Sequence, residues 1–213
     1  MDKEKIISDI RKYVEKELGI ESSGHDWWHV YRVWNMSVKM CEKEGGNLFV
    51  VQLVALLHDI GDWKISDDQE NIIKGIMEKY GVEDDSIRNI CKAVSEISFK
   101  GKNSHVVPSS LEGKIVQDAD RLDALGAVGI ARTFSYGGYS NMSIYNPELK
   151  PDLDKTPEEF KKAKGSVVNH FYEKLLLLKD LMNTDTGKML AKDRHEFLEM
   201  YLKEFFAEWD GKK

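Results

Sequence analysis

Apolar residues recur at intervals of three and four along most of the chain, which is the spacing of one face of a helix. The pattern predicts an amphipathic helix over 6–18 and a second over 26–44. Segment 48–57 is apolar almost all round, and its length of about ten residues favours a buried helix over a buried strand. A Gly-Gly pair at 45–46 would end the second helix, and Asn47 would cap the third.

Further helical patterns follow to the end of the chain, at 68–80, 85–98, 110–118, 121–134, 156–182 and 186–209. No segment of useful length alternates between apolar and polar residues, which is the pattern of a half-buried strand. There is also no repeat, linker or low-complexity tract. The sequence therefore predicts one all-α domain that spans 1–213.

One window departs from this helical pattern. Three of the 4 prolines, Pro147, Pro151 and Pro157, fall within 135–157, together with a Gly-Gly pair. These residues predict a single long loop, and loops of this length inside a compact domain are often functional lids. The C-terminal helices would then occupy about 156–209, with Thr156 as their first cap.

The charge balance narrows the range of partners. The formal net charge is −6, and no basic stripe or block of like charges interrupts the sequence. Polymeric nucleic acid is therefore not expected as a partner, because its phosphate backbone requires a basic surface. A small phosphorylated ligand is compatible with this charge, provided that a metal ion or local cations neutralise it.

The sequence predicts a cytoplasmic protein without a membrane segment. Its first residues lack the apolar core of a signal peptide, and its longest apolar run is about ten residues, too short to cross a bilayer. The 2 cysteines, Cys41 and Cys91, form no CxxC pair and are typical of a reducing compartment. We expect a monomer or a homodimer.

The end of the apolar segment carries the first sign of chemistry. His58 and Asp59 follow it directly, and a carboxylate buried there would cost several kcal/mol unless a cation paired with it. A divalent metal is the economical partner, since imidazole nitrogen and carboxylate oxygen are its usual ligands. His29, on the preceding helix, is the natural third ligand. The fourth would be one of the acids in the segment 115–125, namely Asp118, Asp120 or Asp123.

Four segments of the sequence, HDWWHVYRVW, ALLHDIGDWK, VQDADRLDALGAVGIAR and HFYEKLLLLKDLMNT, resemble the compact bacterial branch of the HD-domain metal-dependent phosphohydrolases. The resemblance covers most of the chain and implies a single-domain helical bundle with a metal-binding core at about 25–125. It implies four metal ligands, His29, His58, Asp59 and Asp120. In that signature the ligand acid precedes a basic residue, as Asp120 does here.

The resemblance also separates functional subtypes. The HDxxED spacing of guanosine tetraphosphate hydrolases is absent, because Asp62 and Trp63 stand at the matching positions. The GYP motif of cyclic-di-GMP phosphodiesterases is absent as well. The nearest similarity is to stand-alone HD proteins that convert nucleoside triphosphates to monophosphate and pyrophosphate, with Mn²⁺ as the expected ion and Ni²⁺, Fe²⁺, Zn²⁺ or Mg²⁺ as alternatives. A phosphomonoesterase or phosphodiesterase on the same metal site is the alternative enzyme, and a metal-stapled regulatory module is the alternative of another class.

Five further residues complete the predicted site. Asp62 would follow the doublet on a continuing helix, where it could transfer a proton or hold a neighbouring side chain in place. Lys64 is a candidate catalytic cation that would offset charge on the transferring phosphate. His25, Arg32 and Tyr136 are assigned to substrate binding, although His25 could instead serve the helix entry and Arg32 could pair with an acid.

Overall fold

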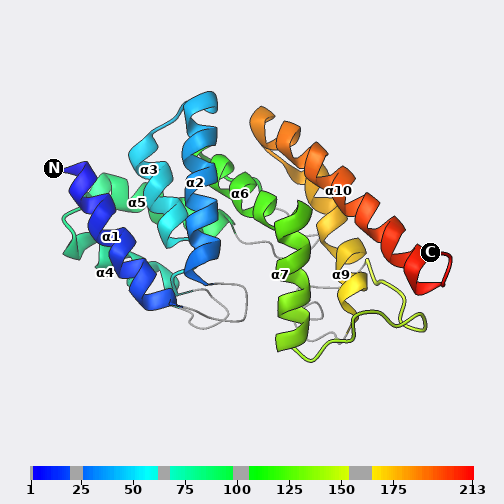
Figure 1. The fold of residues 1–213 in the computed structure, drawn as a ribbon. Coiled ribbons are helices and arrows are strands. Elements are labelled where there is room, and N and C mark those ends of the chain that lie inside the picture. Colours follow the sequence, from blue (N-terminus) through cyan, green and yellow to red (C-terminus); the bar gives the residue numbers. More distant parts are fainter. Residues whose placement is uncertain (1, 20–25, 62–67, 98–105, 154–164) are drawn as a thin grey trace. The chain divides into compact units, whose positions relative to one another are not determined.

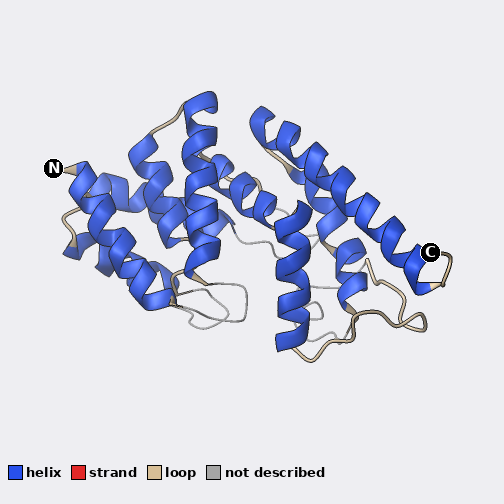
Figure 2. Ribbon diagram, viewed as in Figure 1, coloured by secondary structure: helices blue, strands red, loops and turns tan. Residues whose placement is uncertain are grey.

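The computed structural model describes residues 2–19, 26–61, 68–97, 106–153 and 165–213 (Figure 1). Over these residues the chain is helical, and its strand-like pairing is limited to an isolated parallel bridge between Ser143 and Ser166 (Figure 2). The predicted all-α class is confirmed. In this part of the chain no helix has both the length and the apolar character that a membrane span requires.

The described residues group into two compact units, and each is described here by itself. The first lies within Met1–Phe99 and Val106–Asp120, and the second lies within Arg121–Lys213. The first contains α1 (Lys3–Leu18), α2 (Trp27–Glu44), α3 (Leu48–Leu57), α4 (Gln69–Lys79), α5 (Asp84–Ile97) and most of α6 (Leu111–Asp123). The second contains α7 (Gly126–Tyr139), α9 (Val167–Glu173), the 3₁₀ helix η2 (Leu175–Leu181) and α10 (Asp185–Trp209). The prediction of one domain over the whole chain stays a prediction.

Helix α3 is the centre of the first unit. It packs against α1, α2 and α5, and Leu53, Leu56 and Leu57 have no exposed surface. Each such side chain contributes about 1.5–3 kcal/mol when it leaves water. Asn47 caps the helix as predicted, because its side-chain oxygen accepts from the backbone N–H groups of Phe49 and the next residue, at 3.2 and 3.4 Å. The apolar residues of α3 from Phe49 to Leu57 are thus explained by burial, while Leu48 at its start is exposed and Gln52 is half-buried.

Helix α6 is longer than the sequence predicted. The expected break between 118 and 121 is wrong, because the helix continues through Asp123. The buried amide of Gln117 fixes α6 against the end of α5: its Nε2 donates to the carbonyls of Glu96, Ile97 and Val106 at 3.0, 3.3 and 3.0 Å. These bonds stabilise a continuous helix through a stretch that is rich in acids.

The predicted loop over 135–157 begins later than expected. Helix α7 continues to Tyr139, so Tyr136 and the Gly-Gly pair that follows it are helical. A Cβ atom at Gly137 would lie 2.2 Å from Cγ2 of Val167, a distance that no real contact allows. Gly137 therefore permits close packing of α9 against α7 and does not mark a turn of the chain.

The predicted helix over 156–182 is also wrong in its described part, while its start at Thr156 lies outside the described residues. Helix α9 ends at Glu173, and the chain continues as the 3₁₀ helix η2. A 3₁₀ helix has three residues per turn, so Leu175 and Leu178 lie one above the other, and both are buried. The final helix, predicted over 186–209, is confirmed as α10, which Thr184 caps.

Candidate metal centre

His29 lies in the first turn of α2, where the helix cap fixes its backbone. Asp26 is the N-cap residue, and its Oδ1 accepts from the backbone N–H of His29 at 2.9 Å. This bond satisfies one of the orphan donors at the helix start. The His29 side chain is almost fully buried. The cap therefore places the imidazole at the end of α2, inside the first unit.

His58 and Asp59 follow the last residue of α3, in a turn that covers residues 58–61. The Nδ1 atom of His58 lies 2.8 Å from the carbonyl oxygen of Ala55. A carbonyl can only accept, so Nδ1 carries the proton in this bond. The other nitrogen, Nε2, then presents its lone pair in the neutral ring. A backbone bond that sets the tautomer in this way is typical of histidines that bind metal ions.

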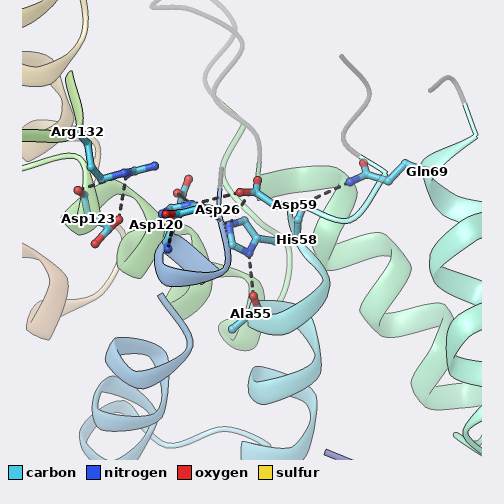
Figure 3. A network of polar contacts seen from close by, with 9 residues as sticks. Asp26, Ala55, His58, Asp59, Gln69, Asp120, Asp123 and Arg132 are labelled. Carbon is cyan, nitrogen blue, oxygen red and sulfur yellow. Dashed lines mark hydrogen bonds and ion pairs between the residues drawn. The ribbon is translucent and has the colours of Figure 1, made fainter. Parts of the chain in front are cut away.

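Two carboxylate side chains, Asp59 and Asp120, meet the two histidines at this point (Figure 3). The Nε2 atom of His29 lies 3.3 Å from Nε2 of His58, 3.3 Å from Oδ2 of Asp59 and 3.4 Å from Oδ1 of Asp120. The Nε2 atom of His58 lies 3.6 Å from Oδ1 of Asp59. His29, His58 and Asp120 each offer a ligand atom within 4.8 Å of the other two. The four predicted ligand residues are therefore brought together, from the ends of α2 and α3 and from α6.

The electrostatics of this cluster favour an ionised Asp120. Burial raises the pKa of its carboxyl group, but the hydrogen bond from His29 and the charges of the two histidines lower it by more. The pKa of Asp120 consequently lies well below its usual range, even though the Asp59 carboxylate opposes this shift. The site thus holds carboxylate charge beside two imidazoles.

The arrangement has more acceptors than donors, which is the condition that a metal ion satisfies. A single N–H on His29 can serve one of the three acceptor groups around it, since each imidazole nitrogen carries at most one proton. A divalent cation can bind all of these groups at once, and a set of imidazole nitrogens and carboxylate oxygens suits a first-row transition metal. The residues present therefore fit such an ion.

The structure distinguishes the three acids of α6 from one another. Asp120 is the one that approaches His29, as the metal signature implied. Asp123 forms an ion pair with Arg132, with its Oδ2 3.0 Å from Nη1 of the arginine. Asp118 is fully buried. Asp120 is accordingly the acid of this segment that can act as a ligand together with the histidines.

The remaining predicted site residues are placed less completely. His25, Asp62 and Lys64 lie outside the described residues. The helix that was expected to carry Asp62 does not continue, because α3 ends at Leu57 and a turn follows. Arg32 lies on α2 three residues after His29, so the two residues are neighbours on the same side of the helix. Tyr136 is half exposed on α7, in the second unit.

One residue of the site was missed by the sequence analysis. Gln69, the first residue of α4, donates from Nε2 to the carbonyls of His58 and Ile60 at 3.2 and 3.1 Å (Figure 3). Hydrogen bonds from a side chain to a distant backbone leave no periodic or motif signal. No pattern in the sequence could have identified this glutamine.

Comparisons with known proteins agree with this geometry. The profile of the HD domain family matches residues 27–125, a range that contains all four side chains of the cluster. The uncharacterized protein YpgQ of Bacillus subtilis is 38% identical over 206 residues, which cover 95% of this chain and 93% of YpgQ.

Solved structures are similar over nearly the whole chain. A Lactobacillus plantarum protein has a TM-score of 0.90 at 36% identity, over 99% of this chain and 100% of its own. Bacillus subtilis YpgQ in complex with ADP has a TM-score of 0.77 at 35% identity, over 96% and 95% of the two chains. A Bacillus thuringiensis protein, described as an HD-superfamily hydrolase, has a TM-score of 0.77 at 39% identity, over 98% of each chain.

Proposed function

The chain belongs to the HD domain family and is a metal-dependent hydrolase, and from this premise we propose that it hydrolyses nucleoside triphosphates to monophosphate and pyrophosphate. The observation that carries the proposal is the meeting of three acceptor groups, from His58, Asp59 and Asp120, around Nε2 of His29. An acceptor-rich cluster of this kind provides a place for a cation, which phosphate chemistry requires.

We assign His29, His58, Asp59 and Asp120 as the metal ligands. A divalent ion held by them supplies Lewis-acid chemistry, which activates water and offsets charge on a phosphate oxygen. Manganese is the proposed ion, because two imidazoles make Mg²⁺ a poorer fit while the two carboxylates suit Mn²⁺. The bond from Nδ1 of His58 to Ala55 selects the tautomer of the neutral ring in which Nε2 presents its lone pair.

A nucleotide is the proposed substrate class. Support comes from the complex of Bacillus subtilis YpgQ with ADP, since that protein is 35% identical to this chain over 96% of it. The absence of the HDxxED and GYP motifs argues against alarmones and cyclic dinucleotides. The formal net charge of −6 argues against polymeric nucleic acid.

The surrounding residues receive roles from their chemistry and position. We assign Lys64, Arg32 and His25 to binding negative phosphate oxygens, because each can donate hydrogen bonds and carry positive charge. Asp62 would transfer a proton at its carboxylate oxygen, and Tyr136 would contact the substrate. Of Lys64, Arg32 and His25, Arg32 is the one that lies within the residues that the structure describes.

We place the protein in the cytoplasm, as a monomer or a homodimer. Both cysteines, Cys41 and Cys91, are free and buried, which agrees with a reducing compartment.

The test is product analysis on a panel of ribo- and deoxyribonucleoside triphosphates with Mn²⁺, followed by chromatography. We expect monophosphate and pyrophosphate from the wild type and none from Asp120→Asn. The matched control is Asp123→Asn, which changes a neighbouring acid that pairs with Arg132 and leaves the cluster intact. Release of orthophosphate from monophosphates, with triphosphates untouched, would contradict the proposal and indicate a nucleotidase.

A further inference from the structure

The turn that carries His58 and Asp59 is held by a side chain from another helix. The amide nitrogen of Gln69 donates to the carbonyl of His58 at 3.2 Å and to that of Ile60 at 3.1 Å. The first carbonyl belongs to the peptide group that precedes Asp59, and the second belongs to the Ile60–Gly61 peptide group. A side-chain amide carries two N–H groups, so a single Gln69 can serve both acceptors at the same time.

This position in the chain needs such a donor. Helix α3 ends at Leu57, and carbonyl groups at and beyond a helix end have no following turn to accept from. Without a partner, the peptide group before Asp59 and the one after Ile60 could rotate, and the Asp59 carboxylate between them would change its orientation. Figure 3 shows Gln69 reaching toward the turn from the side opposite Asp120.

The turn also packs closely against the first turn of α4. Gly61 has a positive φ of +63°, and a Cβ added there would lie 3.1 Å from Cδ1 of Ile72 and 3.6 Å from the Cα of Gln69. Ile60, next to it, is buried. The hydrogen bonds from Gln69 are thus part of a tight contact, in which the glycine lets the backbone of the turn come near α4.

We propose that Gln69 is a positioning residue, which fixes the backbone of the turn at the carbonyls of His58 and Ile60 and thereby sets the metal affinity of the site. The inference rests on the proposed function, because it requires that these side chains bind the metal. Gln69 lies 11 residues after His58, and its amide nitrogen is bonded to backbone carbonyls of the turn. Its contribution is to reduce the number of conformations that the two ligands can adopt before the ion binds.

The experiment is a calorimetric titration of metal-free protein with Mn²⁺ alone, combined with thermal unfolding of the same metal-free samples. Gln69→Met removes the donor, keeps a similar length and adds no charge. Its Mn²⁺ dissociation constant should rise about tenfold, the lower end of the range for residues that support metal ligands from outside the coordination shell. If this variant does not fold, Gln69→Asn, which withdraws the amide by one methylene, should show the same direction of change.

The matched control is Asn169→Leu in the second unit. Asn169 is buried, and its Nδ2 donates to the carbonyl of Leu149 at 2.9 Å. Like the bonds of Gln69, this bond joins a side-chain amide to a backbone carbonyl that is distant in the sequence. This variant should lose stability while its Mn²⁺ affinity stays within twofold of the wild type. If Gln69→Met bound Mn²⁺ as tightly as the wild type, or if Gln69→Met and Asn169→Leu weakened Mn²⁺ binding equally, the inference about Gln69 would be overturned while the proposed function would stand. A wild type that binds no Mn²⁺ would overturn the proposed metal site and the inference together.

Discussion

Replacing His58 by alanine should destabilise the protein in two separable ways. The imidazole donates from Nδ1 to Ala55, a fully buried residue in the last turn of α3, and it also presents Nε2 to the cluster. The loss of the hydrogen bond to Ala55 lowers stability whether or not metal is bound. The loss of Nε2 does so only when metal is supplied, because it removes a ligand.

The magnitudes follow from these contacts. Leaving the buried Ala55 carbonyl without its donor costs about 1–3 kcal/mol. Mn²⁺ at a hundred times its dissociation constant stabilises a protein that binds it by about 2.7 kcal/mol. The variant should therefore be about 2 kcal/mol less stable than the wild type in chelator, and about 5 kcal/mol less stable in Mn²⁺.

The assay is urea unfolding followed by circular dichroism, carried out with EDTA and with Mn²⁺. His195→Ala is the matched control, because His195 is a buried histidine on α10 that takes no part in the cluster. Its Nε2 atom lies 3.5 Å from Oε1 of Glu199. The loss of stability in His195→Ala should be the same in both conditions. If His58→Ala also showed the same loss in EDTA and in Mn²⁺, the histidine would not be a ligand.

Three further predictions concern the neighbourhood of the site. Asp26→Ala and Asn47→Ala each remove a helix N-cap, and each should lower the free energy of unfolding in urea by about 1 kcal/mol. Only Asp26→Ala should also weaken Mn²⁺ binding in calorimetry, because Asp26 holds the backbone of His29. Gly61→Ala should lower stability by about 1 kcal/mol or more, measured in the same way, because the residue has φ +63° and little space for a Cβ; an unchanged midpoint would contradict this. Asp62→Asn should lower kcat while bound metal, measured by elemental analysis, stays constant; a parallel loss of metal would make Asp62 a ligand or its support.

The sequence was informative where burial alone decides the structure. The apolar residues of α3 after Leu48 are buried, and a pattern of hydrophobic residues indicates that directly. The His58–Asp59 doublet was identified for a related reason, since ionisable groups at the end of such a helix need a partner. Its meeting with His29 followed from the packing of α2 against α3.

The sequence was uninformative where the local structure depends on a contact between residues that are distant in the sequence. Nothing in the pattern over 156–182 indicates that α9 stops at Glu173, because an apolar run is compatible with both an α-helix and a 3₁₀ helix. The Gly-Gly pair after Tyr136 was interpreted as part of a long loop, whereas it lies in α7 and Gly137 is required by the approach of Val167. Gln69 acts on backbone atoms, so its role depends on the fold and on no local pattern.

The apolar composition that lets α3 be buried also has a consequence before the protein folds. In the newly synthesised or unfolded chain, LFVVQLVALL is ten residues without charge or proline, which is the composition of a segment that aggregates through β-pairing. Its boundaries are polar: Gly46 and Asn47 precede it, and His58 and Asp59 follow it. Polar and charged residues beside an unavoidable apolar run act as gatekeepers against self-association. The doublet that contributes two of the proposed metal ligands therefore also limits how far an intermolecular strand could extend while the chain is still unfolded.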